Sequence, residues 1–210
     1  MNQMTVATVK HLKSFCKRAL ARIRIPAGKP LRIVVGSAAI PQNGWLATDI
    51  DVLDVTRQDD WERLFTPGSL QAILAEHVWE HLTPNDGRLA VTNCFRFLQP
   101  GGYLRMAVPD GLHPDPAYID MVRPGGCGEG ASDHKVLFTY RTLEALLASA
   151  GFSVVHYENF DEEGKCHVLP WQSEDGMVRR SLRFDPRNTD SEPHFTSIVL
   201  DAVKPVQAPC

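Results

Sequence analysis

The sequence predicts an α/β protein whose core is a mainly parallel sheet with helices on both faces. Short apolar runs rich in β-branched residues alternate along the chain with segments whose apolar residues recur at helical spacing. Strands joined through helices form right-handed crossovers, which make neighbouring strands parallel. The last two apolar runs have no helical segment between them, so we expect them to form an antiparallel pair.

The first predicted strand covers residues 31–36, where a β-branched apolar run ends in a glycine turn. The run at residues 52–55 is also apolar but very short. Similar runs complete the set of expected strands, at residues 45–50, 70–75, 103–108, 152–157 and 196–203.

Three segments are predicted to be helical. One begins at the cap residue Thr83, with a proline at its first position, and continues to about Leu98. A second, at residues 139–151, carries leucines on one face and ends at a glycine. Residues 59–65 form one or two further helical turns.

We expect one domain over residues 31–204, preceded by a basic segment at residues 1–30. That segment has seven basic side chains and no acidic one, with apolar residues at helical spacing. It predicts an amphipathic helix packed on the domain; a transit peptide and a helix on a membrane surface are the alternatives. Within the domain, residues 110–135 are expected to form a lid-like insertion and residues 161–195 a long hairpin excursion.

The composition argues against several classes of partner. The 210-residue chain has 22 Lys and Arg against 25 Asp and Glu, a formal charge of −3, so no nucleic-acid partner is expected. No apolar run approaches the roughly 20 residues that a membrane helix needs, so no integral membrane segment is expected. The five scattered cysteines indicate reduced thiols and a cytoplasmic protein. The oligomeric state stays open.

Polar residues follow the predicted strands at the edge where their carboxyl ends should meet, which is where open parallel sheets bind ligands. A glycine after the first strand allows a ligand close to the backbone, and a carboxylate after the second can accept both ribose hydroxyls. The acidic lining and the lack of a phosphate-binding glycine motif favour a cationic, nucleoside-like ligand. The residues of this edge are Gly36, Ser37, Asp49, Asp51, Asp54, Glu76, His77, Glu80, His81, Asp110 and His113.

Four segments together carry a family resemblance. They are Gly36-Ser37-Ala38-Ala39, then Gly44-Trp45 with Thr48-Asp49-Ile50, then Glu76-His77-Val78-Trp79-Glu80-His81-Leu82, and Phe97-Leu98-Gln99-Pro100-Gly101-Gly102-Tyr103-Leu104. In this order they resemble class I S-adenosylmethionine-dependent methyltransferases. The resemblance is closest to a compact bacterial branch of methyltransferases, type 11-like, found in surface-polysaccharide gene clusters. It covers residues 31–204.

The resemblance implies a Rossmann-like, seven-stranded, mostly parallel sheet of order 3-2-1-4-5-7-6 with the last strand antiparallel. It implies S-adenosylmethionine as cofactor, S-adenosylhomocysteine as product, and methyl transfer to a small-molecule or saccharide acceptor. Asp49 would bind the ribose, Asp54 would lie near the adenine, and Glu76 and His77 would face the transferred methyl group. The implied cofactor-binding residues are Gly36, Ser37, Asp49, Ile50, Asp54, Glu76 and His77.

The first motif departs from the family pattern, in which an acid precedes G-x-G-x-G. Val34 and Val35 precede a single glycine, and serine and alanines replace the remaining glycines. Only 13 positions separate Gly36 from Asp49, which is too short for a full crossover helix. A catalytically degenerate, methyltransferase-fold binding protein is therefore the alternative function.

His77-Val78-Trp79-Glu80-His81 also matches H-x-x-E-H, an inverted zinc-peptidase pattern. On a helix, His77 and His81 would lie one turn apart and could share a metal ion. The strand-like run before them and the break at Pro84 favour a strand-to-helix corner instead. Zinc hydrolysis is thus a further alternative, and the methyltransferase interpretation expects no metal.

Residues 110–135 follow a strand end, are rich in glycine and are too long for a passive connection. We expect a lid that orders over bound cofactor and acceptor. Its His134 is the expected base for an acceptor proton and His113 is second, because the ordinary pKa of histidine suits that task; His77 completes the candidate catalytic residues. Four arginines within residues 179–187 could contact a phosphate or an acidic sugar, or simply be solvated.

Overall fold

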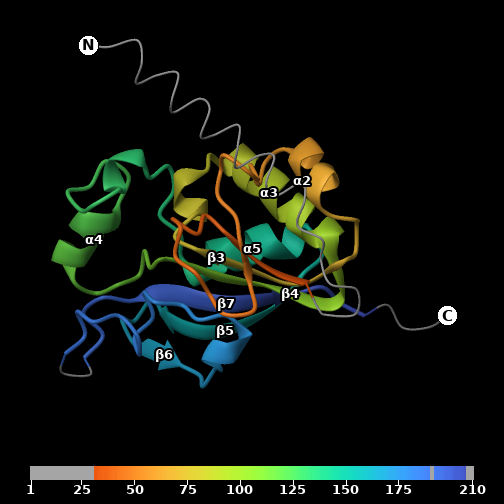
Figure 1. Ribbon diagram of the computed structural model, residues 1–210. Helices are drawn as coiled ribbons and strands as arrows, with labels where there is room; N and C mark the ends of the chain where they lie inside the picture. Colours follow the sequence, from red (N-terminus) through yellow and green to blue (C-terminus); the bar gives the residue numbers. More distant parts are fainter. Residues whose placement is uncertain (1–30, 190–191, 207–210) are drawn as a thin grey trace, which may run out of the picture.

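The structure is a computed structural model that describes residues 31–189 and 192–206 (Figure 1). The helix expected within residues 1–30 lies outside the described residues. None of the helices in the described part of the chain is both long and apolar enough to cross a bilayer.

A seven-stranded sheet of order β2-β1-β3-β4-β7-β5-β6 forms the centre of the molecule. β1 pairs in parallel with β2 and β3, and β3 pairs in parallel with β4, whereas β7 lies antiparallel between β4 and β5. The Rossmann-like fold class and the antiparallel end of the sheet are therefore confirmed. The strands are β1 (Leu31–Val35), β2 (Leu46–Ala47), β3 (Leu70–Glu76), β4 (Leu98–Pro109), β5 (Ser153–Phe160), β6 (Cys166–Val168) and β7 (Ser197–Val203).

The two edges of the sheet differ from the expectation. The prediction of a strand at residues 52–55 is wrong. The amides of Val52 and Leu53 both donate to the carbonyl of Asp49 at 2.8 Å and close a turn instead. The seventh strand is instead β6, which pairs antiparallel with β5 at the opposite edge. Three of the six strand pairings are parallel, so the sheet is mixed rather than mostly parallel.

One face of the sheet is covered by the helices α2 (Gln58–Leu64), α3 (Pro84–Phe97) and α5 (Tyr140–Ser149) (Figure 1). The side chain of Thr83 accepts from the amide of Asp86, so α3 begins at the predicted cap. Thr139 caps α5 in the same way. Alternate residues of β1 point to opposite faces, which places Ile33 in the helical layer and Val34 on the other side.

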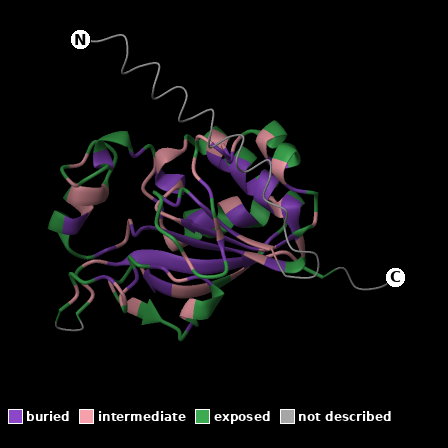
Figure 2. Cartoon of the chain, in the orientation of Figure 1, coloured by how far each residue is buried: buried purple, intermediate pink, exposed green. Residues whose placement is uncertain are grey.

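The other face of the sheet is covered by the excursion rather than by helices in the described chain, which corrects the expectation of helices on both faces. Trp171 and Val178 of the excursion pack with Trp45 and Val34 in a second buried cluster. The buried residues of the sheet in Figure 2 are thus enclosed from both sides.

The excursion is fastened to the sheet by Arg105 of β4, whose side chain is 2% exposed. Its guanidinium donates to both carboxylate oxygens of Asp201 on β7, each at 2.8 Å. Another nitrogen of the same group donates to the carbonyls of Gln172 and Gly176, each at 2.9 Å. The hydroxyl of Tyr157 also donates to Asp201. One buried ion pair therefore joins two strands to the segment that covers them.

Removing one partner of this ion pair should strongly destabilise the fold. We expect Asp201→Ala to lower the free energy of unfolding by about 3–5 kcal/mol, because it leaves a buried guanidinium without its counter-ion. Glu162→Ala breaks the exposed pair with Arg141 and should have a much smaller effect. Urea unfolding of both variants measures the difference; equal losses would contradict the role assigned to Arg105.

Candidate functional site

The loop after β1 adopts a backbone that ordinarily requires glycine. Gly36 has φ +62°, and a Cβ there would lie 2.5 Å from a methyl group of Val78, so only glycine fits. Ala38 and Ala39 are also left-handed, at φ 45° and 61°. The alanines therefore hold a conformation that glycines would adopt at lower cost.

Asp49 holds this loop in place. One carboxylate oxygen accepts from the amide of Ala38 at 2.9 Å, and the other accepts from the amide of Ile50 at 2.8 Å. Asp54 lies in the turn that replaces the expected strand, where its carboxylate accepts from the amide and hydroxyl of Thr56. Asp49 and Asp54, which the resemblance assigns to the ribose and the adenine, thus both accept hydrogen bonds from backbone amides in this structure.

A small pocket of about 240 Å³ opens beside the loop. Four of the predicted cofactor residues line it, namely Gly36, Ser37, Glu76 and His77, whereas Asp49, Ile50 and Asp54 do not. The excursion forms the opposite wall with Met177, Arg179 and Arg180. An oxygen of Glu76 accepts from the amide of Arg180 at 2.6 Å, which fastens that wall to the end of β3.

A larger pocket of about 640 Å³ adjoins the first. His77, Arg179 and Arg180 line both pockets, so the two meet at these residues. Residues 110–135, which contain α4 (Pro116–Val122), supply part of the wall, including Tyr118 and His134. The insertion therefore forms part of the wall of the larger pocket.

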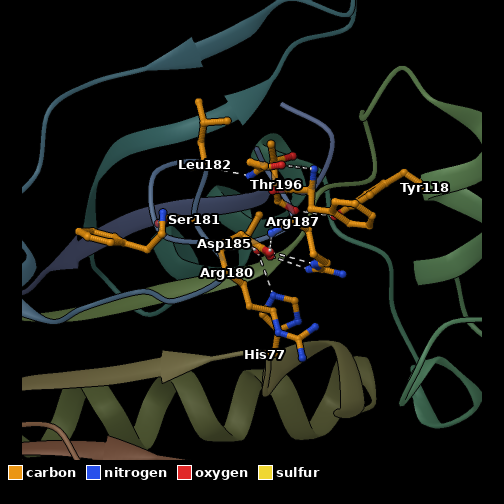
Figure 3. A network of polar contacts seen from close by, with 12 residues as sticks. His77, Tyr118, Arg180, Ser181, Leu182, Asp185, Arg187 and Thr196 are labelled. Carbon is orange, nitrogen blue, oxygen red and sulfur yellow. Dashed lines mark hydrogen bonds and ion pairs between the residues drawn. The ribbon is translucent and has the colours of Figure 1, made fainter. Parts of the chain in front are cut away.

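His77 stands at the junction of the two pockets with φ 54°, a strained backbone for a residue with a Cβ. Its Nε2 lies 3.0 Å from the hydroxyl of Ser197, and that hydroxyl donates to the carbonyl of Arg180. Because the hydroxyl proton is used there, Nε2 of His77 is the donor to Ser197. Its Nδ1 lies 3.1 Å from Glu80 Oε1. Figure 3 shows His77 directed toward the excursion.

His134 lines the larger pocket, and its orientation is fixed by the insertion. Its Nδ1 lies 2.7 Å from the carbonyl of Val122, which only accepts, so Nδ1 is the donor, and in the neutral ring Nε2 is the nitrogen with the lone pair. The ring of His81 meets it edge-on, with centroids 4.8 Å apart. A neutral imidazole with a lone pair at a pocket wall can accept a proton.

His113 does not line either pocket. Its Nδ1 accepts from the amide of Asp115, and its Nε2 lies 2.8 Å from the carbonyl of Pro193. The ring stacks on Tyr118, and burial lowers the pKa of His113. Both nitrogens have partners, so the histidine connects the insertion to the excursion.

Arg187 and Asp185 form a paired unit on the wall of the larger pocket. The carboxylate accepts two hydrogen bonds from the guanidinium, which lies 3.9 Å from the ring centre of Phe195. Burial acts to raise the pKa of Asp185, but the hydrogen bonds from Arg187 lower it overall. Part of the predicted arginine cluster is therefore internally paired, as Figure 3 shows.

Two residues of the site could not be found from the sequence. Ser197 and Tyr118 have no motif, and they reach the pockets only because β7 and α4 are brought there by the fold. Glu80 was expected at the carboxyl edge and within H-x-x-E-H, but its complete burial has no sequence signal.

Solved structures share this arrangement of strands and helices. One is a methyltransferase of Haloferax volcanii in complex with the Trm112 methyltransferase activator, with 14% identity, a TM-score of 0.51, and coverage of 91% of this chain and 89% of that one. Another is a SAM-dependent methyltransferase of Thermotoga maritima, with 12% identity, a TM-score of 0.51, and coverage of 90% and 87%. The fold is that of class I S-adenosylmethionine-dependent methyltransferases. No family model matches the sequence, and no curated protein matches it.

Asp110 anchors the start of the insertion and is completely buried. One carboxylate oxygen accepts from the amide of Leu112 at 2.9 Å and the other from the amide of Phe160 at 2.7 Å. Burial raises the pKa of Asp110 from 3.8 to about 6, against the opposing effect of these two hydrogen bonds. The native state therefore holds this proton more tightly than the unfolded chain does.

This raised pKa predicts a pH-dependent contribution to stability. Because the pKa is higher in the folded state, the protonated carboxyl contributes its full stability below about pH 4. This contribution is lost as the pH rises through about 6. Between pH 4 and 7 the parent should therefore lose up to about 3 kcal/mol of stability relative to Asp110→Asn, which has no titrating group at this position. Urea unfolding at several pH values measures this difference; a pH-independent difference would contradict the assignment.

Proposed function

We propose that the protein transfers a methyl group from S-adenosylmethionine to a small-molecule or saccharide acceptor. The observation that carries this proposal is the pair of adjoining pockets at the carboxyl edge of β1 and β3, which meet at His77. The smaller pocket would take the methionine end of the cofactor and the larger one the acceptor. Their junction is where the methyl group would pass.

The residues present fit the cofactor. Gly36 and Ser37 offer a backbone that a ligand can approach closely, and the carboxylate of Glu76 suits the cationic end of the methionine part. Each oxygen of Asp49 already accepts one amide, but an ionised carboxylate has about four acceptor positions. Two positions therefore remain for the ribose hydroxyls.

When bound, the cofactor supplies an activated sulfonium methyl group. The protein's contribution would be to hold the acceptor in line with it, since proximity and orientation account for much of such catalysis. His134 would take the acceptor proton at Nε2 if the acceptor is a hydroxyl. His113 is the weaker candidate, because its ring nitrogens are both engaged. His77, held by Ser197, would position the junction.

Arginines at the junction favour an acceptor with an anionic group. Arg179 and Arg180 line both pockets, and a guanidinium pairs well with a phosphate or carboxylate. An acidic or phosphorylated sugar fits this lining.

The same proposal includes two further statements. The protein belongs to the compact bacterial branch of these methyltransferases, and it works in the cytoplasm, where the thiols of Cys94, Cys127 and Cys166 stay free.

A cofactor-binding protein without turnover is the second candidate. It is favoured by the alanines in the strained loop, by the hydrogen bonds that Asp49 already accepts from backbone amides, and by the modest size of the smaller pocket. The structure does not support a zinc hydrolase in which His77 and His81 bind one metal ion from adjacent turns of a helix. β3 ends at Glu76 and only the 3₁₀ turn η1 (Trp79–His81) follows, so the two histidines do not share an α-helix.

Asp49→Ala should weaken the binding of S-adenosylhomocysteine roughly ten- to a hundredfold. A lost hydrogen bond to a charged acceptor costs about 1.5–3 kcal/mol. Titration calorimetry measures the affinity, and Asp59→Ala removes the same charge from the exposed start of α2 as the control. Thermal unfolding shows whether each variant keeps its fold.

An unchanged affinity in folded Asp49→Ala would contradict the placement of the ribose. Binding of S-adenosylhomocysteine by the parent, with transfer of label from methyl-labelled S-adenosylmethionine to one of a panel of acidic and phosphorylated sugars, would support the enzyme. Binding without transfer to any of them would favour the second candidate.

A further inference from the structure

The carboxylate of Glu80 has one ion-pair partner, His77, in the described part of the chain. The side chain is completely buried, and neither oxygen accepts a hydrogen bond of good geometry there. The nearest ring nitrogen, Nδ1 of His77, lies 3.1 Å from Oε1. A buried carboxylate without full compensation is costly, so this position calls for a cation.

Two histidines complete a ligand set around Glu80. One ligand atom each of Glu80, His81 and His134 lies within 4.8 Å of the other two. Zinc ligands at bond lengths near 2.0 Å lie about 3.3 Å apart in a tetrahedral site. Small side-chain rotations would therefore bring these three atoms into coordination distance.

The backbone holds the two ligand-bearing segments together. The carbonyl of Glu80 accepts from the amide of Lys135 at 2.6 Å and from that of Val136 at 3.2 Å. His134 ends the 3₁₀ turn η2 (Ala131–Asp133), so it is fixed one residue before this contact. The ligands thus come from two short turns joined by direct backbone hydrogen bonds.

The surroundings of the histidines have the pattern found around metal ligands. A ligating histidine usually donates its other ring nitrogen to a carbonyl or carboxylate. Nδ1 of His134 donates to the carbonyl of Val122, which leaves Nε2 for a metal. Nδ1 of His81 lies 3.4 Å from a carboxylate oxygen of Asp133. The ring of His134 is therefore oriented by a partner of the expected type, whereas Nδ1 of His81 makes no hydrogen bond of good geometry among the described residues.

We propose that Glu80, His81 and His134 bind a divalent transition-metal ion, with Zn²⁺ the best match to two imidazoles and one carboxylate. His81 and His134 line the larger pocket, so a fourth coordination position would face that pocket. Three protein ligands with one open position are typical of zinc sites that contact a substrate. An oxygen of a pocket ligand would be the natural occupant.

This site differs from the one that the H-x-x-E-H pattern suggests. Among the described residues, the metal-capable group contains His134 from a distant part of the chain and not His77. His77 stays at the rim, bonded to Ser197 and adjacent to Glu80. Metal binding at Nε2 of His134 would exclude its proposed role as proton acceptor, because both use the same lone pair. The test uses the metal alone, so its outcome is distinguishable from that of the methyl-transfer assay.

Chelator-treated full-length protein should be titrated with Zn²⁺ against a chromophoric chelator. We expect one ion per chain, and with Co²⁺ in its place we expect visible absorption bands typical of nitrogen and oxygen ligands in a four-coordinate site. Glu80→Gln and His134→Gln should each weaken the affinity more than about a hundredfold, since even outer partners contribute up to that factor. His167→Gln, at an exposed histidine outside the group, is the control.

Glu80→Gln keeps the volume of the side chain and removes its buried charge, so the metal-free variant should unfold at no lower temperature than the parent. This measurement separates a lost site from a lost fold. Absence of stoichiometric binding by the parent would overturn the proposal. Binding that survives His134→Gln, or that is lost equally in His167→Gln, would overturn it as well.

Discussion

The buried guanidinium of Arg105 connects the sheet to the segment that builds half of the candidate site. It binds Asp201 within the sheet and two carbonyls of the excursion, so the excursion is fixed against the face that lacks helices in the described chain. Beyond that attachment, the excursion supplies Arg179 and Arg180 to both pockets and Met177 to the smaller one. The site therefore depends on an ion pair that does not itself touch it.

A second constraint is the sharp corner where β3 ends. The chain turns there through the strained backbone of His77, and the side chain of Val78 leaves no room for a Cβ at Gly36. The same corner buries Glu80 and directs His77 to the junction of the pockets. Strain of this kind persists only where surrounding contacts impose it, and it concentrates at functional sites.

Patterning predicted most of the sheet because its strands are buried on both faces and read as continuous apolar runs. The same signal failed at residues 52–55. Val52, Leu53 and Val55 are buried in a turn, and composition alone cannot distinguish a buried turn from a short strand. β6 was missed because its three residues are half-exposed or exposed and carry no alternation.

Strand order predicts which polar residues gather at the carboxyl edge, but the contacts within the candidate site could not be predicted. Glu76 ends β3 and His77 follows it, so both reach the edge by local geometry. His134 meets His81 because the amides of the two residues after His134 donate to the carbonyl of Glu80. These hydrogen bonds join parts of the chain that are distant in sequence. His113 was the second candidate for the base, and Pro193 of the excursion and Asp115 occupy its two ring nitrogens.

The most direct test is a crystal structure of the protein grown with S-adenosylhomocysteine. We expect density for the amino-acid end in the smaller pocket near Gly36 and Glu76, the sulfur facing the larger pocket beside His77, and the ribose outside the smaller pocket at Asp49. Density for the ligand at any other place, or an empty smaller pocket at saturating ligand concentration, would contradict this placement.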